Sequence, residues 1–251
     1  MHPIERLRYV ARDGGAEPEL LAVEAASALA AVARDPRALV TSAKRLVELH
    51  LGCAPLVWVA ARVLASLDPE QEAREAAAAI EEDATLEELA AALPGGATVV
   101  ADASRVVLGS LARRGDVTAR VVRTDLRSPG LGGSARGKVT SWRADEVADA
   151  ASGAVVAVVE VVAAGPDGCV LDPAALAVAR EAAARSLPLW AVAGVGHVLP
   201  GPLFEALAQR LPAASRLPVA ALGRVVGPDG PTEPSVALAR PGCPSPPELA
   251  R

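Results

Sequence analysis

Aromatic side chains make up only 2% of this chain of 251 residues, so its interior must be built from alanine, valine and leucine. Long apolar runs are missing as well, because the longest candidate, residues 154–164, is interrupted by Glu160. A transmembrane helix needs about 18 or more consecutive apolar residues, so we expect no membrane span. Residues 1–6 contain no apolar signal core, and we therefore expect a cytoplasmic protein rather than a secreted one.

Cysteine and histidine are equally sparse. The three cysteines (Cys53, Cys169 and Cys243) are an odd number and far apart, which argues against a disulfide framework and a structural zinc site. The three histidines (His2, His50 and His197) lack metal-ligand spacing, so no metal is expected. A net charge of −5 argues against a general nucleic-acid-binding protein, because such a protein needs a surplus of lysine and arginine. With 51% hydrophobic residues, the chain has enough apolar material for a sizeable core.

The N-terminal part has apolar residues at helical spacing. Three stretches follow the 3.6-residue period, namely 17–33, 37–49 and 54–67. Between Asp68 and Glu88, nine acidic residues accompany a single basic one, Arg74. This composition predicts a solvated helix, broken near Ala84-Thr85, that leads out of a helical domain.

The pattern changes at Pro94-Gly95-Gly96, which marks a boundary. Beyond it, strand-like and helix-like segments alternate, and the valine-rich run 154–159 is typical of a strand buried on both faces. Expected strands are 97–100, 119–124, 139–142, 154–159, 189–193 and 219–226, and expected helices are 104–114, 144–151, 173–185 and 202–209. We therefore predict an α/β protein with a doubly wound parallel sheet. An all-helical domain spans 1–93, and an α/β domain spans 94–251 and ends in a proline-rich tail on the surface.

Positive charge is concentrated in residues 101–145, which carry nine basic and four acidic side chains. The same segment contains the glycine-rich loop 128–134, and glycine N–H groups beside arginine form an anion site. Arg127 follows an expected strand, and ligands of doubly wound sheets bind at the carboxyl ends of strands. These features predict a site for a phosphorylated small molecule. A solvated basic face with a loose loop remains an equal alternative.

The remaining motifs do not indicate a cofactor site or a catalytic residue. Gly130-x-Gly132-x-x-Ala135 formally matches a dinucleotide fingerprint, but residues 125–129 separate it from the preceding strand, so no cofactor is expected. The chain has neither a G-x-S-x-G nor a G-x-x-x-x-G-K-[ST] motif, and we assign no catalytic residue. Glu160 ends an expected strand and is a candidate site residue. His197 is interpreted as a plain loop histidine, and Cys169 as a buried structural thiol.

Several short segments share the motifs of one known family. Residues 52–56 are similar to (R/P)-S-M-A-P-L, 104–108 to S-x-x-V-L, 124–129 to E-S/G-R-P, 167–172 to N-G-x-V-x-N-K, 188–193 to V-P-F-Y-V-V-A, and 246–249 to P-P-E-L-I. In this order they resemble the family of the translation initiation factor 2B alpha, beta and delta subunits, methylthioribose-1-phosphate isomerase and ribose-1,5-bisphosphate isomerase. The resemblance implies that a Rossmann-like α/β domain follows the helical domain along the chain, and that the protein dimerises through this α/β domain.

The resemblance fails at the positions that the isomerases use for catalysis. Their cysteine after the first α/β strand is replaced within Ala101 to Ser104, their aspartate falls on Val162, and the lysine of N-K becomes Pro173. Aldose–ketose isomerisation needs a proton carrier and an acid, so their loss predicts a non-catalytic member. The phosphate-binding side survives better. The predicted ligand-binding residues are Ser104, Arg105, Arg127, Gly132, Gly133, Glu160, Asp167 and Asp172.

Three functional hypotheses follow. The first is a non-catalytic initiation factor 2B-like protein that binds a sugar phosphate or nucleotide and acts in regulation or partner contact, as a homodimer or higher oligomer. The second is a phosphosugar isomerase whose acid and base have moved to Asp102, Glu160 or Cys169. The third is a structural subunit of an oligomer that binds no ligand.

Overall fold

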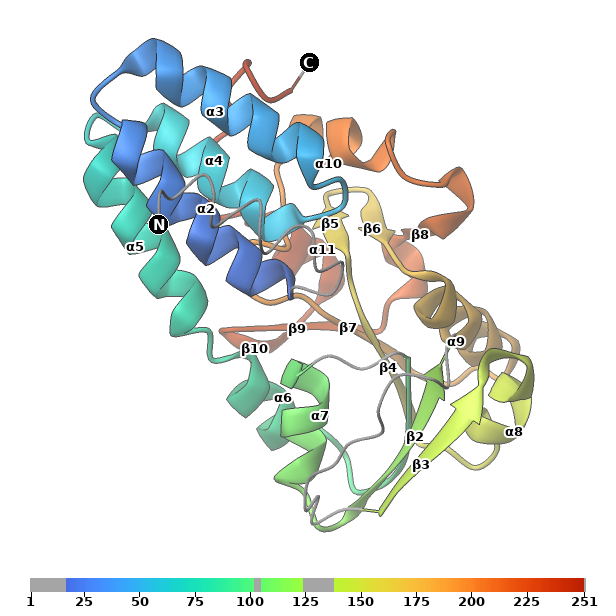
Figure 1. Ribbon diagram of the computed structural model, residues 1–251. Coiled ribbons are helices and arrows are strands. Elements are labelled where there is room, and N and C mark those ends of the chain that lie inside the picture. The colour runs from blue at the N-terminus through green and yellow to red at the C-terminus, as the bar shows by residue number, and fades with distance from the viewer. Residues whose placement is uncertain (1–16, 102–104, 124–137, 251) are drawn as a thin grey trace.

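The structure is a computed structural model that describes residues 17–101, 105–123 and 138–250, with Arg105, Lys138 and Ala214 described by their backbone alone. A helical bundle lies above an α/β layer in Figure 1. No helix in these described ranges is long and apolar enough to cross a membrane.

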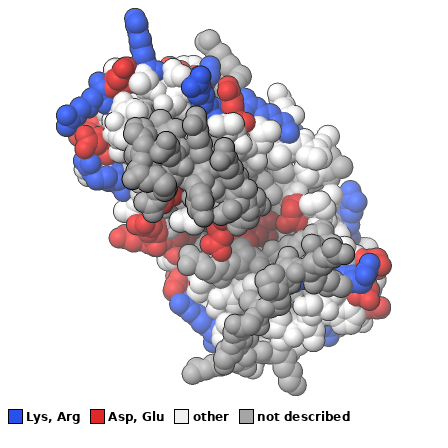
Figure 2. Space-filling view, viewed as in Figure 1, with Lys and Arg blue, Asp and Glu red and all other residues white. Residues whose placement is uncertain are grey.

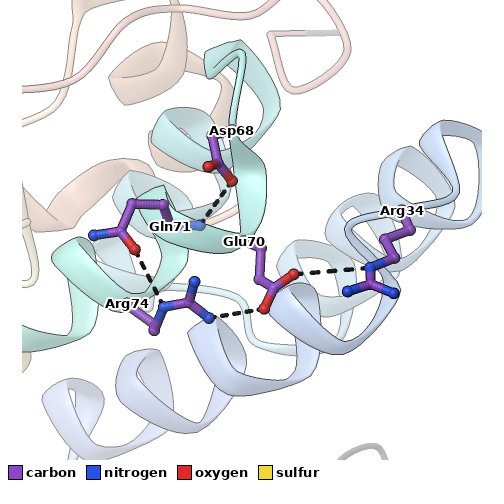
Figure 3. A network of polar contacts seen from close by, with 5 residues as sticks. All are labelled: Arg34, Asp68, Glu70, Gln71 and Arg74. Atoms are coloured by element: carbon purple, nitrogen blue, oxygen red, sulfur yellow. Dashed lines mark hydrogen bonds and ion pairs between the residues drawn. The ribbon is translucent and has the colours of Figure 1, made fainter.

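Four helices form the bundle: α2 (Pro18–Val32), α3 (Pro36–Leu49), α4 (Ala54–Ala65) and α5 (Pro69–Glu81). Each has a proline in its first turn. Backbone N–H groups at this position have no acceptor within the helix, so proline costs no hydrogen bond there. Asp35 and Asp68 cap α3 and α5, and the Asp68 carboxylate accepts a hydrogen bond from the Gln71 N–H at 3.1 Å (Figure 3). Helix α4 is buried along most of its length, as its apolar sequence predicts.

The polar contacts on the outside of the bundle are exposed. Glu70 accepts a hydrogen bond from Arg74 at 2.9 Å, and its other oxygen lies 4.0 Å from Arg34 Nε (Figure 3). Exposed ion pairs contribute little to stability, because water competes for both charges. Burial of apolar residues from α2, α4 and α5 therefore holds the bundle together.

Seven strands form the main sheet in the order β10-β9-β7-β4-β1-β2-β3. They are β1 (Gly96–Ala101), β2 (Val117–Arg123), β3 (Lys138–Arg143), β4 (Val156–Glu160), β7 (Leu189–Val192), β9 (Arg224–Gly227) and β10 (Gly230–Thr232). All neighbouring pairs are parallel except β9 and β10. The strand order reverses between β1 and β4, so the predicted doubly wound parallel sheet is confirmed.

Helices cover both faces of this sheet (Figure 1). One face is covered by α6 (Thr85–Ala92) and α7 (Arg105–Ala112), and the other by η1 (Ala144–Glu146), α8 (Val147–Ala151) and α9 (Pro173–Ala184). Successive residues of β4 alternate between the two cores: Val156 and Val158 pack with α6 and α7, and Ala157 and Val159 with α9. The break between α5 and α6 falls at residues 82–84, as the acidic segment predicts.

The sequence patterns missed a second, three-stranded sheet of β5 (Ala163–Gly165), β6 (Gly168–Val170) and β8 (Arg216–Pro218). The remaining elements are α10 (Gly201–Ala208), η2 (Ala213–Ser215), η3 (Val219–Ala221) and α11 (Pro234–Leu238). The expectation of a purely superficial tail is wrong at its end. Leu249 is 7% exposed and belongs to the core of the bundle, where the described C-terminal residues return (Figure 1).

Candidate functional site

The carboxyl ends of the parallel strands face the helical bundle (Figure 1). Strands β1, β4 and β7 end at Ala101, Glu160 and Val192, and the switch in strand order lies between β1 and β4. Ligands of open α/β sheets bind outside the carboxyl ends of strands near such a switch. We call this part of the molecule the strand-end region and treat it as the candidate site.

The structure describes only some of the predicted ligand-binding residues, namely Arg105, Glu160, Asp167 and Asp172. Ser104, Arg127, Gly132 and Gly133 lie outside the described residues. Arg105 is the first residue of α7, which follows β1. Glu160 ends β4 and is half-buried, so it lies in the strand-end region where the sequence predicts a site residue.

Asp167 and Asp172 belong to the β5–β6 hairpin and its continuation. In this hairpin Ala163 is paired with Val170, so the chain returns toward the end of β4 by the time it reaches Asp172. Asp172 Oδ1 accepts a hydrogen bond from the Ala175 N–H at 2.8 Å and caps α9. Asp167 is exposed in the turn at the opposite end of the hairpin. The fold therefore brings Asp172 and Glu160 to the same end of the sheet and leaves Asp167 apart.

Most described arginines of the basic segment have structural partners. Arg113 pairs with Glu87 at 2.7 Å, and Arg114 pairs with Asp116 at 2.7 Å. Arg120 donates to the carbonyl oxygens of Ala150 and Ser152, and Arg143 pairs with Asp145 at 3.1 Å. For these four side chains the alternative of a structural basic face is the better interpretation.

The loop after β7, residues 193–198, is one of the contacts between the α/β layer and the bundle. Asp83 Oδ2, from the α5–α6 connection, accepts a hydrogen bond from the Val195 N–H at 2.7 Å, and its Oδ1 accepts one from the Thr85 N–H at 2.8 Å. A Cβ on Gly194 would lie 2.5 Å from Asp83 Oδ2. Gly196 has a φ of +84°, and a Cβ there would lie 2.9 Å from Pro55 Cα. The loop can approach the bundle this closely because glycines occupy both positions.

His197 is buried inside this contact. Its Nε2 lies 3.7 Å from Glu19 Oε1, and its Nδ1 has no hydrogen-bond partner in the described part of the chain. Burial lowers the pKa of His197, although the nearby Glu19 and Asp83 carboxylates act in the opposite direction. The imidazole is therefore neutral at neutral pH. It belongs to the contact between the two layers and is absent from the walls of the cavities described next.

Two cavities lie on either side of the contact between Asp83 and Val195. The first, of about 200 Å³, is lined by five carboxylate side chains and three apolar ones: Glu17, Glu19, Glu81, Asp83, Glu87, Ile80, Leu86 and Val106. We call it the acidic cavity. In Figure 2 acidic side chains gather across the middle of the molecule, between the bundle and the α/β layer.

The second cavity, of about 270 Å³, lies beyond the carboxyl ends of β7 and β9. Its walls include residues 193–196 and Val198 of the loop after β7, the turn between β9 and β10, and residues 240–242, with Trp58 of α4 lining it from the bundle. We call it the β7–β9 cleft. Its two charged side chains are Asp229 and Arg240, neither of which the sequence patterns singled out as a site residue.

The cysteines offer no reactive thiol. Burial raises the pKa of Cys53, Cys169 and Cys243 to about 12, so all three thiols stay protonated at neutral pH. Cys169 lies in β6 with almost no exposure, as the sequence analysis expected of a structural thiol. Among the described residues, no group of three or more His, Cys, Asp or Glu side chains could hold a metal ion.

The resemblance places the catalytic aspartate of the isomerases at Val162 and their lysine at Pro173. In this chain both residues have a structural role. Val162 packs against the core of the helical bundle, and its neighbour Val161 is buried. Pro173 is the first residue of α9, behind the Asp172 cap. Neither Val162 nor Pro173 can move a proton, so any acid or base in the strand-end region must come from other residues.

No protein-family model and no curated protein matches the sequence. Solved structures do match. A chain of the tetrameric eIF2B-beta2-delta2 complex from Chaetomium thermophilum is 15% identical with a TM-score of 0.79, covering 94% of this chain and 92% of that one. The translation initiation factor eIF-2B of Pyrococcus horikoshii OT3 is 15% identical with a TM-score of 0.70, covering 94% and 98%.

An enzyme shares the same architecture. The 5-methylthioribose 1-phosphate isomerase of Pyrococcus horikoshii OT3 is 14% identical with a TM-score of 0.62, covering 95% of this chain and 86% of that one. These matches run over nearly the whole length of the chain. At such low identity they establish a shared fold, which confirms the fold that the short motifs predict.

Proposed function

Since this chain has the fold of the eIF2B beta and delta subunits and of 5-methylthioribose 1-phosphate isomerase, we propose that it is an initiation factor 2B-like protein that binds a phosphorylated small molecule without isomerising it. The ligand is a sugar phosphate or a nucleotide, and it binds in the strand-end region. Its binding regulates the protein or the contact that the protein makes with a partner chain.

One observation carries the proposal. The usual ligand position of a doubly wound sheet, at the switch between β1 and β4, lies along the same edge of the sheet as the 270 Å³ β7–β9 cleft, which the helical bundle borders through Trp58. A ligand in this place contacts both layers at once. Its binding energy is therefore available to change how the layers fit together, as a regulatory ligand requires.

The absence of isomerase chemistry is supported by the chain's own groups. An acid and a base are needed at the reacting carbons. The three cysteines have pKa values of about 12, and Val162 and Pro173 carry no titratable group. The likeness to an isomerase keeps the second hypothesis open to test, with Glu160 as its remaining described candidate.

One of the similar eIF2B structures is a tetrameric complex of beta and delta subunits. We propose that this chain also self-associates, at least as a homodimer. Light scattering coupled to size-exclusion chromatography should give twice the 25.4 kDa mass of the chain or more. A monomer at every concentration would refute this part of the proposal.

The ligand proposal is tested by a thermal-shift screen against sugar phosphates, sugar bisphosphates and nucleoside phosphates. A ligand at 100 times its Kd stabilises the fold by about 2.7 kcal/mol, which is roughly 5–10 °C for a chain of this size. We expect such a shift with one phosphorylated compound and none with its dephosphorylated form. If no phosphate compound shifts the Tm, the third hypothesis, a structural subunit, replaces this one.

Two further measurements refine the outcome. The compound that binds should show no aldose–ketose conversion by NMR, and turnover would replace the proposal with the isomerase hypothesis. Arg127→Ala should weaken binding by about 1.5–3 kcal/mol, because a hydrogen bond from arginine to phosphate is charge-assisted. An unchanged affinity would remove Arg127 from the proposed site.

A further inference from the structure

Helix α3 is the least buried helix of the bundle. Only Leu39 and Ala43 of its 14 residues are buried, because α3 packs on one side against α2 and α4. In Figure 2 basic side chains stand out along the part of the bundle where Figure 1 places α3. The outer side of this helix is therefore open to another molecule.

The outer face of α3 carries cations that the fold does not use. Arg34, which precedes the helix, and Arg37, Lys44 and Arg45 are all exposed. Arg34 lies 4.0 Å from Glu70. Within residues 17–101, 105–123 and 138–250, the side chains of Arg37, Lys44 and Arg45 make no ion pair and no hydrogen bond. These three charges are available to an anionic partner.

The carboxylates of the same segment do not cancel this charge. Asp35 caps the helix, since its Oδ1 accepts hydrogen bonds from the Arg37 and Ala38 N–H groups at 3.0 and 3.1 Å. Glu48 is the other acidic residue among residues 34–49, which contain four basic ones. Residues 68–88 of the same bundle contain nine acidic residues and one basic one. The face of α3 is thus a local positive patch on a chain with a net charge of −5.

Exposed leucines adjoin this patch at the end of α3. Leu49 is 73% exposed and Leu51 is 56% exposed. Leu51 also lines a depression of about 20 Å³ between the end of α3 and α10, together with Val47 and Leu207. A single exposed leucine is ordinary on a protein surface. Two of them beside an apolar depression and free cations resemble a protein interface, which has an apolar centre and a polar rim.

The spacing of these side chains fits a helical partner. Arg37 and Lys44 are seven residues apart, which is about two helical turns, and Leu49 follows little more than one turn later. A second helix packed along α3 presents the residues of one face at the same two-turn repeat. Its carboxylates can then reach the cations while its apolar side chains reach the leucines. A nucleic-acid backbone has phosphates but no counterpart for the leucines.

We propose that the outer face of α3, with Leu49 and Leu51, binds an acidic amphipathic helix of a partner protein. The inference rests on one part of the proposed function, the contact with a partner chain, and makes that part specific. It does not depend on the strand-end region. Because the cations are exposed, salt screens them, and the affinity should fall as the ionic strength rises.

The test uses the full chain and a synthetic helical peptide with glutamates and leucines at heptad spacing, and it measures binding by fluorescence anisotropy. The same peptide with glutamine in place of glutamate should bind at least about tenfold more weakly. Lys44→Glu/Arg45→Glu should weaken the acidic peptide by at least about tenfold, because two attractions become repulsions. The matched control is Arg180→Glu/Arg224→Glu, which changes the net charge equally at two exposed arginines of the α/β layer.

The control variant should bind the acidic peptide as the wild type does, and the Tm of each variant reports that it folds. Leu49→Ala/Leu51→Ala should also weaken the acidic peptide, and this loss should persist at high salt, because apolar contacts are not screened. An affinity that is insensitive to salt and to the leucines would contradict the inference.

Four outcomes would overturn the inference. They are no binding of the acidic peptide by the wild type, equal affinity in the two charge-reversed variants, loss of the homodimer in Lys44→Glu/Arg45→Glu, and binding to phosphatidylserine vesicles in place of the peptide. The third would assign the face to a second copy of the chain, and the fourth to a membrane surface. The thermal-shift screen for phosphorylated ligands is independent of all four, so the ligand part of the proposed function stands or fails separately.

Discussion

At the scale of single residues, burial decides the charge state of the histidine between the two layers. His197 is 4% exposed and lies beside Glu19 and Asp83, yet desolvation is the largest influence and lowers its pKa. A histidine whose pKa is lowered by folding binds its proton more weakly in the folded state than in the unfolded chain. The folded state therefore favours the neutral form of His197.

This shift predicts a loss of stability in mild acid. Well above pH 6.5, the unfolded reference value, His197 is neutral in both states and contributes no pH dependence. As the pH falls below 6.5, the unfolded chain gains a proton that the folded one resists, so the free energy of unfolding falls, by at most about 1.4 kcal/mol per pH unit for one proton. Denaturant titrations between pH 7.5 and 5 measure this slope.

The matched variants are His197→Gln and His50→Gln. His50 also has a pKa lowered by burial, but it is only half-buried at the end of α3. We expect His197→Gln to flatten the pH profile and His50→Gln to keep most of the wild-type slope. A His197→Gln profile parallel to that of the wild type would show that another group causes the dependence.

A second prediction at this scale concerns Gly194. In Gly194→Ala the new Cβ would lie 2.5 Å from Asp83 Oδ2, so the carboxylate must leave the Val195 N–H. Leaving these groups without their partners should cost about 1–3 kcal/mol of unfolding free energy. Gly115→Ala is the control, because a Cβ there meets nothing within 4 Å and should change stability by no more than about 0.5–1 kcal/mol. Equal stability of the two variants would contradict the role of this contact.

At the scale of elements, Asp172 shows how one side chain serves a helix in a region also proposed to bind a ligand. Asp172→Ala removes the cap of α9 and should lower the unfolding free energy by about 1 kcal/mol. Asp172→Asn keeps an acceptor oxygen and should stay within a few tenths of a kcal/mol of the wild type. Thermal and denaturant unfolding measure both variants. If asparagine destabilises as much as alanine, the charge of Asp172 matters more than the cap.

At the scale of the whole molecule, the C-terminal tail stabilises the N-terminal bundle. Leu249 packs into the core of the helical bundle, although the entire α/β layer separates it in sequence from α5, the last helix of that bundle. Leu249→Ala should lower the unfolding free energy by about 1.5–3 kcal/mol, the transfer free energy of a buried leucine. Leu67→Ala, at a fully exposed leucine between α4 and α5, should change it by less than about 0.5 kcal/mol. A difference too small to measure between them would mean that the tail does not stabilise the bundle.

Local sequence signals were sufficient for most of the elements and for the fold class. The helical spacing of apolar residues in α2 and α3 and the valine-rich run of β4 act within a few turns or one strand, so they are readable without the tertiary structure. The short strands β5, β6 and β8 were missed because Ala163–Gly165 and Gly168–Val170 have only three residues each. What makes them strands is pairing across the chain, since β8 follows β6 only after α9, β7 and α10.

The sequence by itself determined most of the helices, the central strands and the doubly wound sheet, because these follow from residue type and local spacing. Only the tertiary structure decided which charges remain available to a ligand. It pairs Arg113, Arg114 and Arg143 with carboxylates and, among the residues that the structure describes, leaves Arg240 without one. Arg240 lies in a cleft whose lining includes Gly194 and Trp58, which are far from it along the chain. Whether an arginine binds a ligand or a neighbour depends on the residues that folding brings beside it, and these are far away along the chain.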